Sequence, residues 1–337
     1  MMRLYLAPME ELTGYVFRRV IDKHFGCIDK YFTPFISPDN SIMKTKSARE
    51  ISPENNKGLN VVPQLLANDP ELFNEAAKLI AGFGYEEINI NFGCPSNTVT
   101  GKFKGSGILR APDIMDRFLD GVFNGKDSAL RDYPDLKISL KTRVGYNDTA
   151  EFENAAKIIS RYPFSEITVH PRLKKDMYGG RPRMEMFDEA CRKLKCDIAY
   201  NGDITSVHDH DDLIKHITLE APDTNIYGNV KAIMIGRGAI TDPGIFRHIK
   251  TGMVMTTDEL YDFLSDLFET YKEDVGVGNA LAKLKEVWSY TTGLLEDDKE
   301  HARVFKTIVK SKDEASYKDA AAAARKSFRL SSALSSK

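Results

Sequence analysis

Short apolar runs alternate with longer amphipathic stretches along most of this sequence, and this alternation limits its fold more than any other feature. The runs have the length of strands, and the stretches between them have helical periodicity. The predicted strands are residues 4–7, 30–35, 61–65, 87–91, 136–142, 166–170, 197–201 and 231–235. The predicted helices among them are residues 15–24, 70–83, 112–123, 149–162, 184–194 and 206–217.

Eight strands with intervening helices over roughly 250 residues match an α/β fold of the (β/α)8 TIM-barrel type. An open doubly wound sheet is the alternative, but it usually needs fewer strands and often a glycine-rich first turn. The first strand here is followed by Pro8-Met9-Glu10-Glu11 instead. After about Thr257 the strand-like runs stop, and helices are predicted at 258–274, 279–292, 300–309 and 314–329. We therefore predict a barrel domain at residues 1–250 and a small C-terminal helical domain at residues 251–337.

Composition narrows the class of protein without identifying it. A formal net charge of -2 gives no global argument for nucleic-acid binding. The cysteines are few and lack a CxxC pair, which suits a reducing cytoplasm better than a disulfide framework; they are Cys27, Cys94, Cys191 and Cys196. No signal peptide and no apolar run of membrane-spanning length is present in the sequence. We expect a cytoplasmic protein without a membrane segment.

The end of the predicted helical domain is locally basic. Ten basic residues face four acidic ones, a local excess of +6: Lys299, Arg303, Lys306, Lys310, Lys312, Lys318, Arg325, Lys326, Arg329 and Lys337 against Glu300, Asp313, Glu314 and Asp319. Each of these residues alone is best interpreted as part of a solvated helix face. As a set they suit contact with a polyanion.

The fourth predicted strand leads into Asn91-Phe92-Gly93-Cys94-Pro95. Gly93 and Pro95 end the strand, so Cys94 is expected at the start of a loop. A buried free cysteine and a reactive thiol are equally good interpretations of this stretch alone. The other strand ends favour chemistry, because seven of the eight carry polar or ionisable groups, and barrel chemistry takes place at those ends.

Two of these ends contain glycine, Asn201-Gly202-Asp203 after the seventh strand and Gly236-Arg237-Gly238 after the eighth. Many barrels bind phosphate at this place through backbone N–H groups. A phosphorylated ligand is therefore expected. The run from His208 to Asp212 has histidines and acids, but we interpret it as a solvated helix start, and we expect no metal site.

These motifs together resemble the tRNA-dihydrouridine synthases in order and spacing, from the first strand through the eighth. The matching segments are Ala7-Pro8-Met9-Glu10, Gln64-Leu65-Leu66, Asn91-Phe92-Gly93-Cys94-Pro95, Lys141-Thr142-Arg143-Val144-Gly145, His170-Pro171-Arg172, Tyr178, Asn201-Gly202-Asp203 and Ile235-Gly236-Arg237-Gly238. The resemblance implies an enzyme, an FMN-bound barrel followed by a helical RNA-binding domain. It implies reduction of the C5=C6 bond of a uridine in tRNA, with NADPH as the electron donor.

Site residues are implied position by position. The FMN-binding residues would be Pro8, Met9, Glu10, Gln64, Lys141, His170, Asn201, Gly202, Asp203, Gly236 and Arg237. Cys94 would be the catalytic proton donor. The residues facing the uracil or its backbone would be Asn91, Arg143, Arg172 and Tyr178. The chain departs from the usual family pattern at Pro171 and Leu173, in the loop on the substrate side.

Chemical reasoning agrees with these roles. Hydride transfer to C6 leaves negative charge at C5, so a nearby acid such as a neutral thiol must protonate C5. Lys141 would stabilise the reduced flavin ring, and the basic tail would grip a tRNA whose uridine is swung out. The alternatives are an FMN-dependent barrel dehydrogenase for a small pyrimidine or enone, and a non-enzymatic RNA-binding barrel. We expect a monomer, although the sequence leaves the oligomeric state and the modified tRNA position open.

Overall fold

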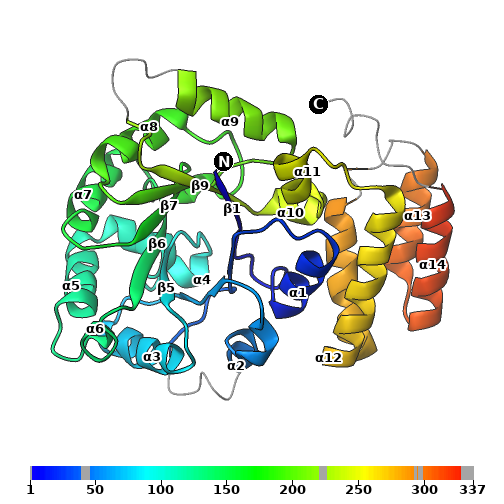
Figure 1. Cartoon of the computed structure of the whole chain (residues 1–337), viewed down its shortest axis with the longest axis horizontal. Coiled ribbons are helices and arrows are strands. Elements are labelled where there is room, and N and C mark those ends of the chain that lie inside the picture. Colours follow the sequence, from blue (N-terminus) through cyan, green and yellow to red (C-terminus); the bar gives the residue numbers. More distant parts are fainter. Residues whose placement is uncertain (1, 39–45, 220–225, 292–293, 295–298, 328–337) are drawn as a thin grey trace. The chain divides into compact units, whose positions relative to one another are not determined.

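The computed structural model of the protein describes residues 2–38, 46–219, 226–291, 294 and 299–327 (Figure 1). The chain forms two compact units, each made of several segments. The first contains residues 1–8, 29–202 and 215–234, and the second contains residues 9–28, 203–214 and 235–337. The predicted domain boundary after residue 250 lies within the second unit and stays a prediction.

A closed parallel sheet is the framework of the first unit. Its strands are β1 (Arg3–Leu6), β2 (Lys30–Phe32), β3 (Val61–Val62), β4 (Gln64–Leu65), β5 (Glu87–Phe92), β6 (Lys137–Arg143), β7 (Glu166–His170), β8 (Asp197–Tyr200) and β9 (Val230–Ile235). Their order is β3-β2-β1-β9-β8-β7-β6-β5-β4, and the registers from β1 to β3 and from β4 to β9 are parallel. Only Pro63 separates β3 from β4, so the two ends of this series meet and the sheet closes.

Pro63 explains why nine strands form an eight-stranded barrel. β3 pairs with β2 and β4 pairs with β5, so one stretch of chain bridges both neighbours. Proline has no N–H to donate to a ladder, which interrupts the assignment at this residue. The carbonyl of Pro63 still accepts from the Asn89 N–H at 2.9 Å. The predicted (β/α)8 barrel is confirmed, and the open sheet is excluded because an open sheet has two edges.

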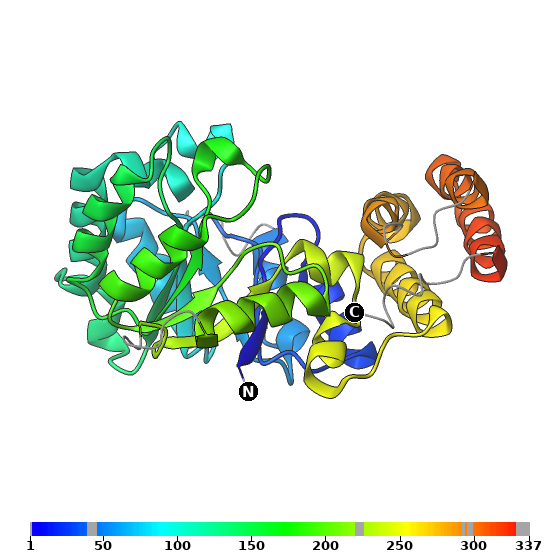
Figure 2. The ribbon, with the colours of Figure 1, turned by 90° about the horizontal axis from the view of Figure 1, so that it is seen from above.

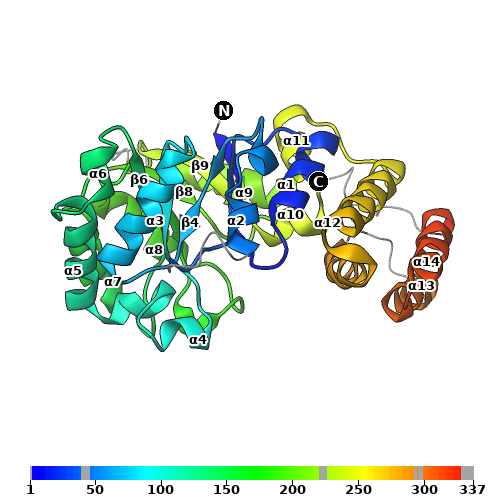
Figure 3. The same ribbon diagram turned by 90° about the horizontal axis from the view of Figure 1, so that it is seen from below.

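Amphipathic helices surround the strands of the first unit (Figures 2 and 3). α3 (Pro70–Gly82), α5 (Pro112–Phe123), α7 (Ala150–Ile159) and α8 (Met184–Lys193) pack against one another in that order. α5 buries Met115, Phe118, Leu119 and Val122, the spacing of one helical face. Shorter helices are α2 (Lys46–Glu50), α4 (Asn97–Thr100) and α6 (Ala129–Asp132), and α9 (Val207–Leu219) has residues in both units.

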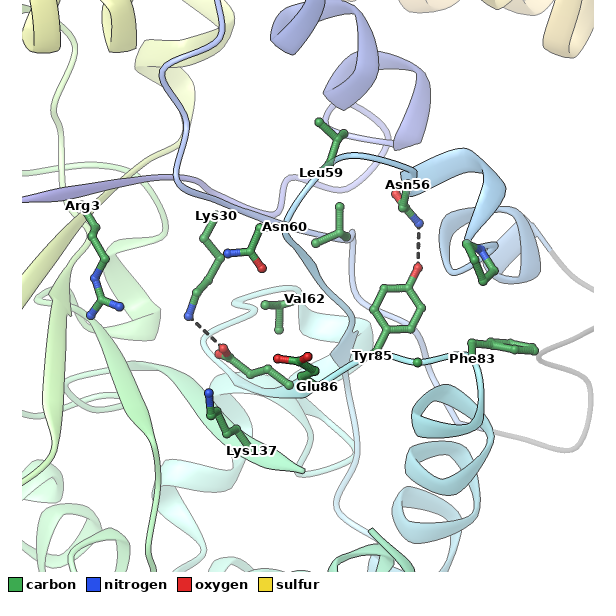
Figure 4. A pocket seen from close by; sticks show the side chains of 14 residues that line it. Arg3, Lys30, Asn56, Leu59, Asn60, Val62, Phe83, Tyr85, Glu86 and Lys137 are labelled. Atoms are coloured by element: carbon green, nitrogen blue, oxygen red, sulfur yellow. Dashed lines mark hydrogen bonds and ion pairs between the residues drawn. The ribbon is translucent and has the colours of Figure 1, made fainter. Parts of the chain in front are cut away.

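The end of the barrel where the strands begin is closed by a buried ion network. Lys30 Nζ lies 2.8 Å from Glu87 Oε2 and 3.3 Å from Glu166 Oε1, and the Tyr5 hydroxyl donates to Glu166 Oε2 at 2.7 Å. Burial, and next the Glu166 charge, raise the pKa of Tyr5 far above its usual value. A pocket of about 540 Å³ opens beside this network (Figure 4). TIM-barrel active sites lie at the other end, so this pocket is not the candidate site.

The second unit consists of helices. They are α1 (Tyr15–His24), α10 (Arg237–Thr241), α11 (Ile245–Thr251), α12 (Thr257–Thr291), α13 (Lys299–Lys310) and α14 (Glu314–Ser327). The two helices predicted over 258–292 are both present in α12, where they meet at a kink at Gly276, whose φ of 79° is not helical. Buried Trp288 of α12 donates its indole N–H to the Tyr317 hydroxyl of α14 at 3.1 Å. The predicted C-terminal helices are confirmed, except that residues 292 and 328–329 lie outside the described part of the chain.

The strand bounds differ from the prediction mainly at β2. This strand ends at Phe32 rather than at residue 35, because Pro34 has no N–H to continue the ladder. Over the described ranges, no helix is both long and apolar enough to cross a membrane.

Candidate functional site

The carboxyl ends of β4, β5, β6 and β7 bring five of the predicted site residues onto adjacent strands. Asn91 of β5 is the register partner of Lys141 of β6, and Arg143 of β6 is the partner of His170 of β7. Gln64 lies on β4, on the other side of β5. Residues two apart on a strand share one face, so Lys141 and Arg143 point the same way.

A chain of side-chain hydrogen bonds crosses three of these strands. Asn91 Nδ2 donates to Gln64 Oε1 at 2.7 Å, and Gln64 Nε2 donates to Asn89 Oδ1 at 2.7 Å. Asn89 Nδ2 then donates to Ser139 Oγ at 2.9 Å. All four side chains are buried, so these bonds fix their orientations. Asn89 and Ser139 were not among the predicted site residues, although the Asn89-x-Asn91 alternation marks two amides on one strand face.

The loop that carries Cys94 is held from both sides. Asn91 Oδ1 accepts from the Gly93 N–H at 2.9 Å and from the Cys94 N–H at 2.8 Å. The carbonyl of Cys94 accepts from the N–H and the hydroxyl of Ser106 at 3.0 and 2.8 Å. Gly105 has a φ of +55°, and a Cβ there would lie 2.7 Å from the Cys94 carbonyl oxygen. The thiol is therefore presented by a loop of fixed backbone.

Arg143 ties this loop to the one after β7. Its Nε donates to the Gly93 carbonyl at 3.0 Å, and its Nη1 donates to the Leu173 carbonyl at 2.8 Å. The side chain is 1 % exposed, and burial lowers its pKa to about 10. Leu173, where the chain departs from the family pattern, therefore binds Arg143 through its backbone carbonyl. The proposed contact of Arg143 with the substrate stays a prediction.

Arg172 shapes the loop after β7 in a similar way. It donates to the carbonyls of Gly179 and Gly180 at 3.1 and 2.5 Å, and its Nη1 lies 3.3 Å from His170 Nε2. Tyr178, on the same loop, is 55 % exposed, and its ring centroid lies 5.6 Å from the Arg143 guanidinium. Of the residues predicted to face uracil, Tyr178 is the one that is open to solvent in this unit.

Lys141 is a second cation close to the Cys94 loop. A Cβ on Gly93 would lie 3.9 Å from Lys141 Nζ. Burial, and next the neighbouring Arg143 charge, lower the pKa of Lys141 to about 7. Within the described ranges no carboxylate forms an ion pair with this ammonium. A partly buried ammonium of this kind suits an anionic partner supplied by a ligand.

The remaining predicted cofactor residues are divided between the two units. Pro8, Asn201 and Gly202 belong to the first unit, where Asn201 Nδ2 donates to the Met234 carbonyl at 2.9 Å. The second unit holds Met9, Glu10, Asp203, Gly236 and Arg237.

In the second unit Arg237 Nη2 lies 2.7 Å from Asp203 Oδ1. A Cβ on Gly238 would lie 2.1 Å from the Ile204 carbonyl oxygen, so the turn after β9 requires glycine there. His208 pairs only with Asp212 among the ion pairs seen here, and the described residues contain no group of His, Cys, Asp and Glu side chains that would hold a metal.

The basic residues of the C-terminal helices lie on two helices, α13 and α14. On α14, Lys318 pairs with Glu269 and Glu314 at 2.7 Å, and Arg325 pairs with Asp258 and Asp262. On α13, Arg303, Lys306 and Lys310 are exposed and follow the spacing of one helix face. Arg329 and Lys337 lie outside the described residues, as does the side chain of Lys299. The predicted polyanion contact of these helices stays a prediction.

One family model and several curated proteins are similar to this chain. The model of the family "Dihydrouridine synthase (Dus)" matches residues 5–330. The "tRNA-dihydrouridine synthase B" of Pasteurella multocida (strain Pm70) is 30% identical over 247 residues, covering 73% of this chain and 68% of its own. The "Probable tRNA-dihydrouridine synthase" of Staphylococcus aureus (strain Mu50) is 29% identical over 277 residues, covering 80% of this chain and 78% of its own.

Among solved structures, the old yellow enzyme homologue of Zymomonas mobilis is similar over 75% of this chain and 90% of its own, with 12% identity and a TM-score of 0.47. At this level of similarity the two proteins need not share a function. The family model spans nearly the whole chain, including the barrel strands and the C-terminal helices. The chain belongs to the dihydrouridine synthase family of flavin-dependent reductases.

Proposed function

We propose that this protein reduces the C5=C6 bond of a uridine in tRNA to dihydrouridine, using FMN and NADPH. The observation that carries the proposal is the Cys94 loop, whose N–H groups are held by Asn91, on the strand next to Lys141. The reaction needs an acid that protonates the uracil base and a cation that stabilises the reduced cofactor. The Cys94 thiol, on its fixed loop, and the Lys141 ammonium can supply these two groups.

The residues present fit a flavin. Lys141 has a lowered pKa, and no carboxylate of the described residues forms an ion pair with it. Its ammonium therefore suits the negative charge of a reduced isoalloxazine edge. Gln64 offers an amide whose orientation is fixed by Asn89 and Asn91. In the second unit, Arg237 and the turn at Gly236 provide a guanidinium and backbone for a phosphate group. When bound, FMN would supply the hydride that adds to C6 of uracil.

Cys94 would supply the proton. As hydride arrives at C6, the electron pair of the C5=C6 bond moves to C5, and the thiol S–H proton is transferred to that carbon. The thiolate left behind takes its next proton from solvent. Asn91 and Ser106 keep the loop backbone in place during this transfer, because each binds a backbone group of Cys94. Exposed Tyr178 would contact the uridine or its backbone.

The test compares two cysteine variants. Cys94→Ala should retain bound flavin and lose dihydrouridine formation in tRNA by at least about a hundredfold, the scale of a lost general acid. Cys196→Ala is the matched control, since this thiol lies just before β8, at the end of the barrel where the strands begin. It should keep full activity. Full activity of the Cys94→Ala protein would overturn the assigned role, and reduction of free uracil in preference to tRNA would favour a small-molecule dehydrogenase.

A further inference from the structure

Exposed apolar side chains gather at one end of the first unit. Phe103 is 38 % exposed and Met177 is 42 % exposed, and with Tyr178 they lie on the loops after β5 and β7. Both Phe103 and Met177 have positive φ, 53° and 51°. Left-handed backbone is uncommon for such side chains and persists only where the surroundings impose it. The fold thus holds large apolar groups toward solvent at strained positions.

Cations and rings interleave beside these groups. The Arg110 guanidinium lies 5.0 Å from the Phe103 ring centroid and 4.4 Å from that of Tyr146. The Lys174 ammonium lies 5.1 Å from the Tyr146 centroid and 2.7 Å from Asn97 Oδ1. These contacts connect the loops after β5, β6 and β7, and α4 lies beside the loop after β7 in Figures 2 and 3. We call Phe103, Arg110, Tyr146 and Lys174 the cation–aromatic rim.

The loops after β5 and β7 carry a strong positive charge. Residues 97–110 and 171–183 contain eight basic side chains and one acidic one, Asp176: the basic residues are Lys102, Lys104, Arg110, Arg172, Lys174, Lys175, Arg181 and Arg183. Asp176 is already paired with Arg183, and Arg172 is buried, so the other six cations form the basic surface. The chain as a whole has a formal charge of -2, so this excess is local. A basic surface with exposed rings is suited to an unpaired nucleic-acid strand, because phosphates meet the cations and bases stack on the rings.

We propose that the cation–aromatic rim binds the unpaired nucleotides that flank the target uridine, with Phe103 as a stacking platform. The inference rests on the proposed function, since a uridine swung out toward Cys94 leaves its neighbours unstacked. Stacking on a ring needs no particular base, so the rim adds affinity for single-stranded RNA without choosing its sequence. Arg110 keeps the Phe103 ring in place and presents its own guanidinium plane to the next base or phosphate.

The experiment measures binding of a labelled single-stranded RNA of about ten nucleotides to the flavin-loaded full chain. Phe103→Ala should weaken this binding about tenfold, the scale of one lost base–ring stack, and Phe103→Trp should restore it. The Phe103→Ala enzyme should also show a KM for tRNA about tenfold higher with little change in kcat, because a flanking contact is uniform binding. Thermal unfolding of each variant reports whether the fold is intact.

Phe83→Ala is the matched control, because it truncates a partly exposed ring that lines the pocket at the opposite strand ends (Figure 4). It should bind the oligonucleotide as the unmodified protein does. Unchanged binding by Phe103→Ala, or no binding of the oligonucleotide by the unmodified protein, overturns the proposal. Dihydrouridine formation by the unmodified protein is measured separately, so a failure of the rim and a failure of the proposed function give different results.

Discussion

The side-chain oxygen of Asn91 accepts the backbone N–H of Cys94 at 2.8 Å, while the amide nitrogen of Asn91 donates to Gln64 at 2.7 Å. One side chain thus couples the loop that carries the thiol to a buried polar chain inside the barrel. Its amide is largely occupied by the protein itself. Asn91 therefore acts on Cys94 as a positioning residue, whatever further contact it makes with a substrate.

The first prediction is that Asn91→Ala lowers dihydrouridine formation at least about tenfold while flavin stays bound. The variant leaves the Gly93 and Cys94 N–H groups and the side-chain Oε1 of Gln64 without their partner. Each unpaired buried group costs about 1–3 kcal/mol. The rate of Cys94 alkylation by iodoacetamide should change, because the thiol is no longer fixed. Asn60→Ala, at the beginning of the strands, is the control and should alter neither rate. An unchanged alkylation rate in Asn91→Ala would contradict the positioning role.

A second prediction concerns the stability cost of Lys141. Its folded pKa of about 7 lies below the ordinary value of 10.5, so folding penalises the charged form. This penalty is fully present below about pH 7 and disappears as the pH rises toward 10.5. Lys141→Met should therefore stabilise the flavin-free protein on the order of 2 kcal/mol at pH 7.

Denaturant unfolding at two pH values tests the Lys141 prediction. The stability gain of Lys141→Met should fall by about half between pH 7 and pH 9, following the linkage of charge to folding. The same variant should bind FMN more weakly, since the cation for the reduced ring is lost. A gain that does not vary with pH would show that lost strain, rather than lost charge, stabilises the variant.

A third prediction concerns the barrel end opposite to the site. Lys30 is 8 % exposed and contacts both Glu87 and Glu166. Lys30→Met leaves these two carboxylates without that cation, and we expect a loss of about 3 kcal/mol in the free energy of unfolding. Lys137→Met removes an exposed lysine from the same pocket and should change stability by less than about 0.5 kcal/mol. Equal effects of the two variants would contradict a buried network.

The strand and helix pattern was predictable because periodicity and breakers are local. Eight apolar runs gave the barrel, and the position of Pro63 changed only how one strand is divided. Motif position also predicted Asn91, Lys141, Arg143 and His170 at one barrel end. In the strand registers Asn91 pairs with Lys141, and Arg143 pairs with His170. What these side chains contact depends on loops far apart in the sequence.

Arg143 illustrates the limit. Its partners are the carbonyls of Gly93 and Leu173, 50 and 30 residues away, and a carbonyl leaves no signature in the sequence. The charged tail shows the same limit: Lys318 and Arg325 are matched by acids on α12, which no local count of charges reveals. The positive charge beside the cation–aromatic rim is visible in the sequence, because residues 97–110 and 171–183 contain almost no acidic side chains.

The last prediction distinguishes the two basic C-terminal helices. Arg303, Lys306 and Lys310 share an exposed face of α13, and Lys318 and Arg325 of α14 lie in ion pairs with acidic residues. Changing the three α13 residues to Gln should weaken tRNA binding at least about tenfold and lower the slope of log affinity against log salt by about 2–3, because each phosphate contact releases close to one counterion.

The matched control changes Lys318 and Arg325 to Gln. Neighbouring carboxylates already neutralise these cations. Their loss should therefore lower the slope of log affinity against log salt by less than about one, the change expected for one phosphate contact. Filter binding at several salt concentrations provides both slopes for the full-length protein. If the α14 variant loses as much slope as the α13 variant, the polyanion contacts both helices, and the ion pairs must open when the RNA binds.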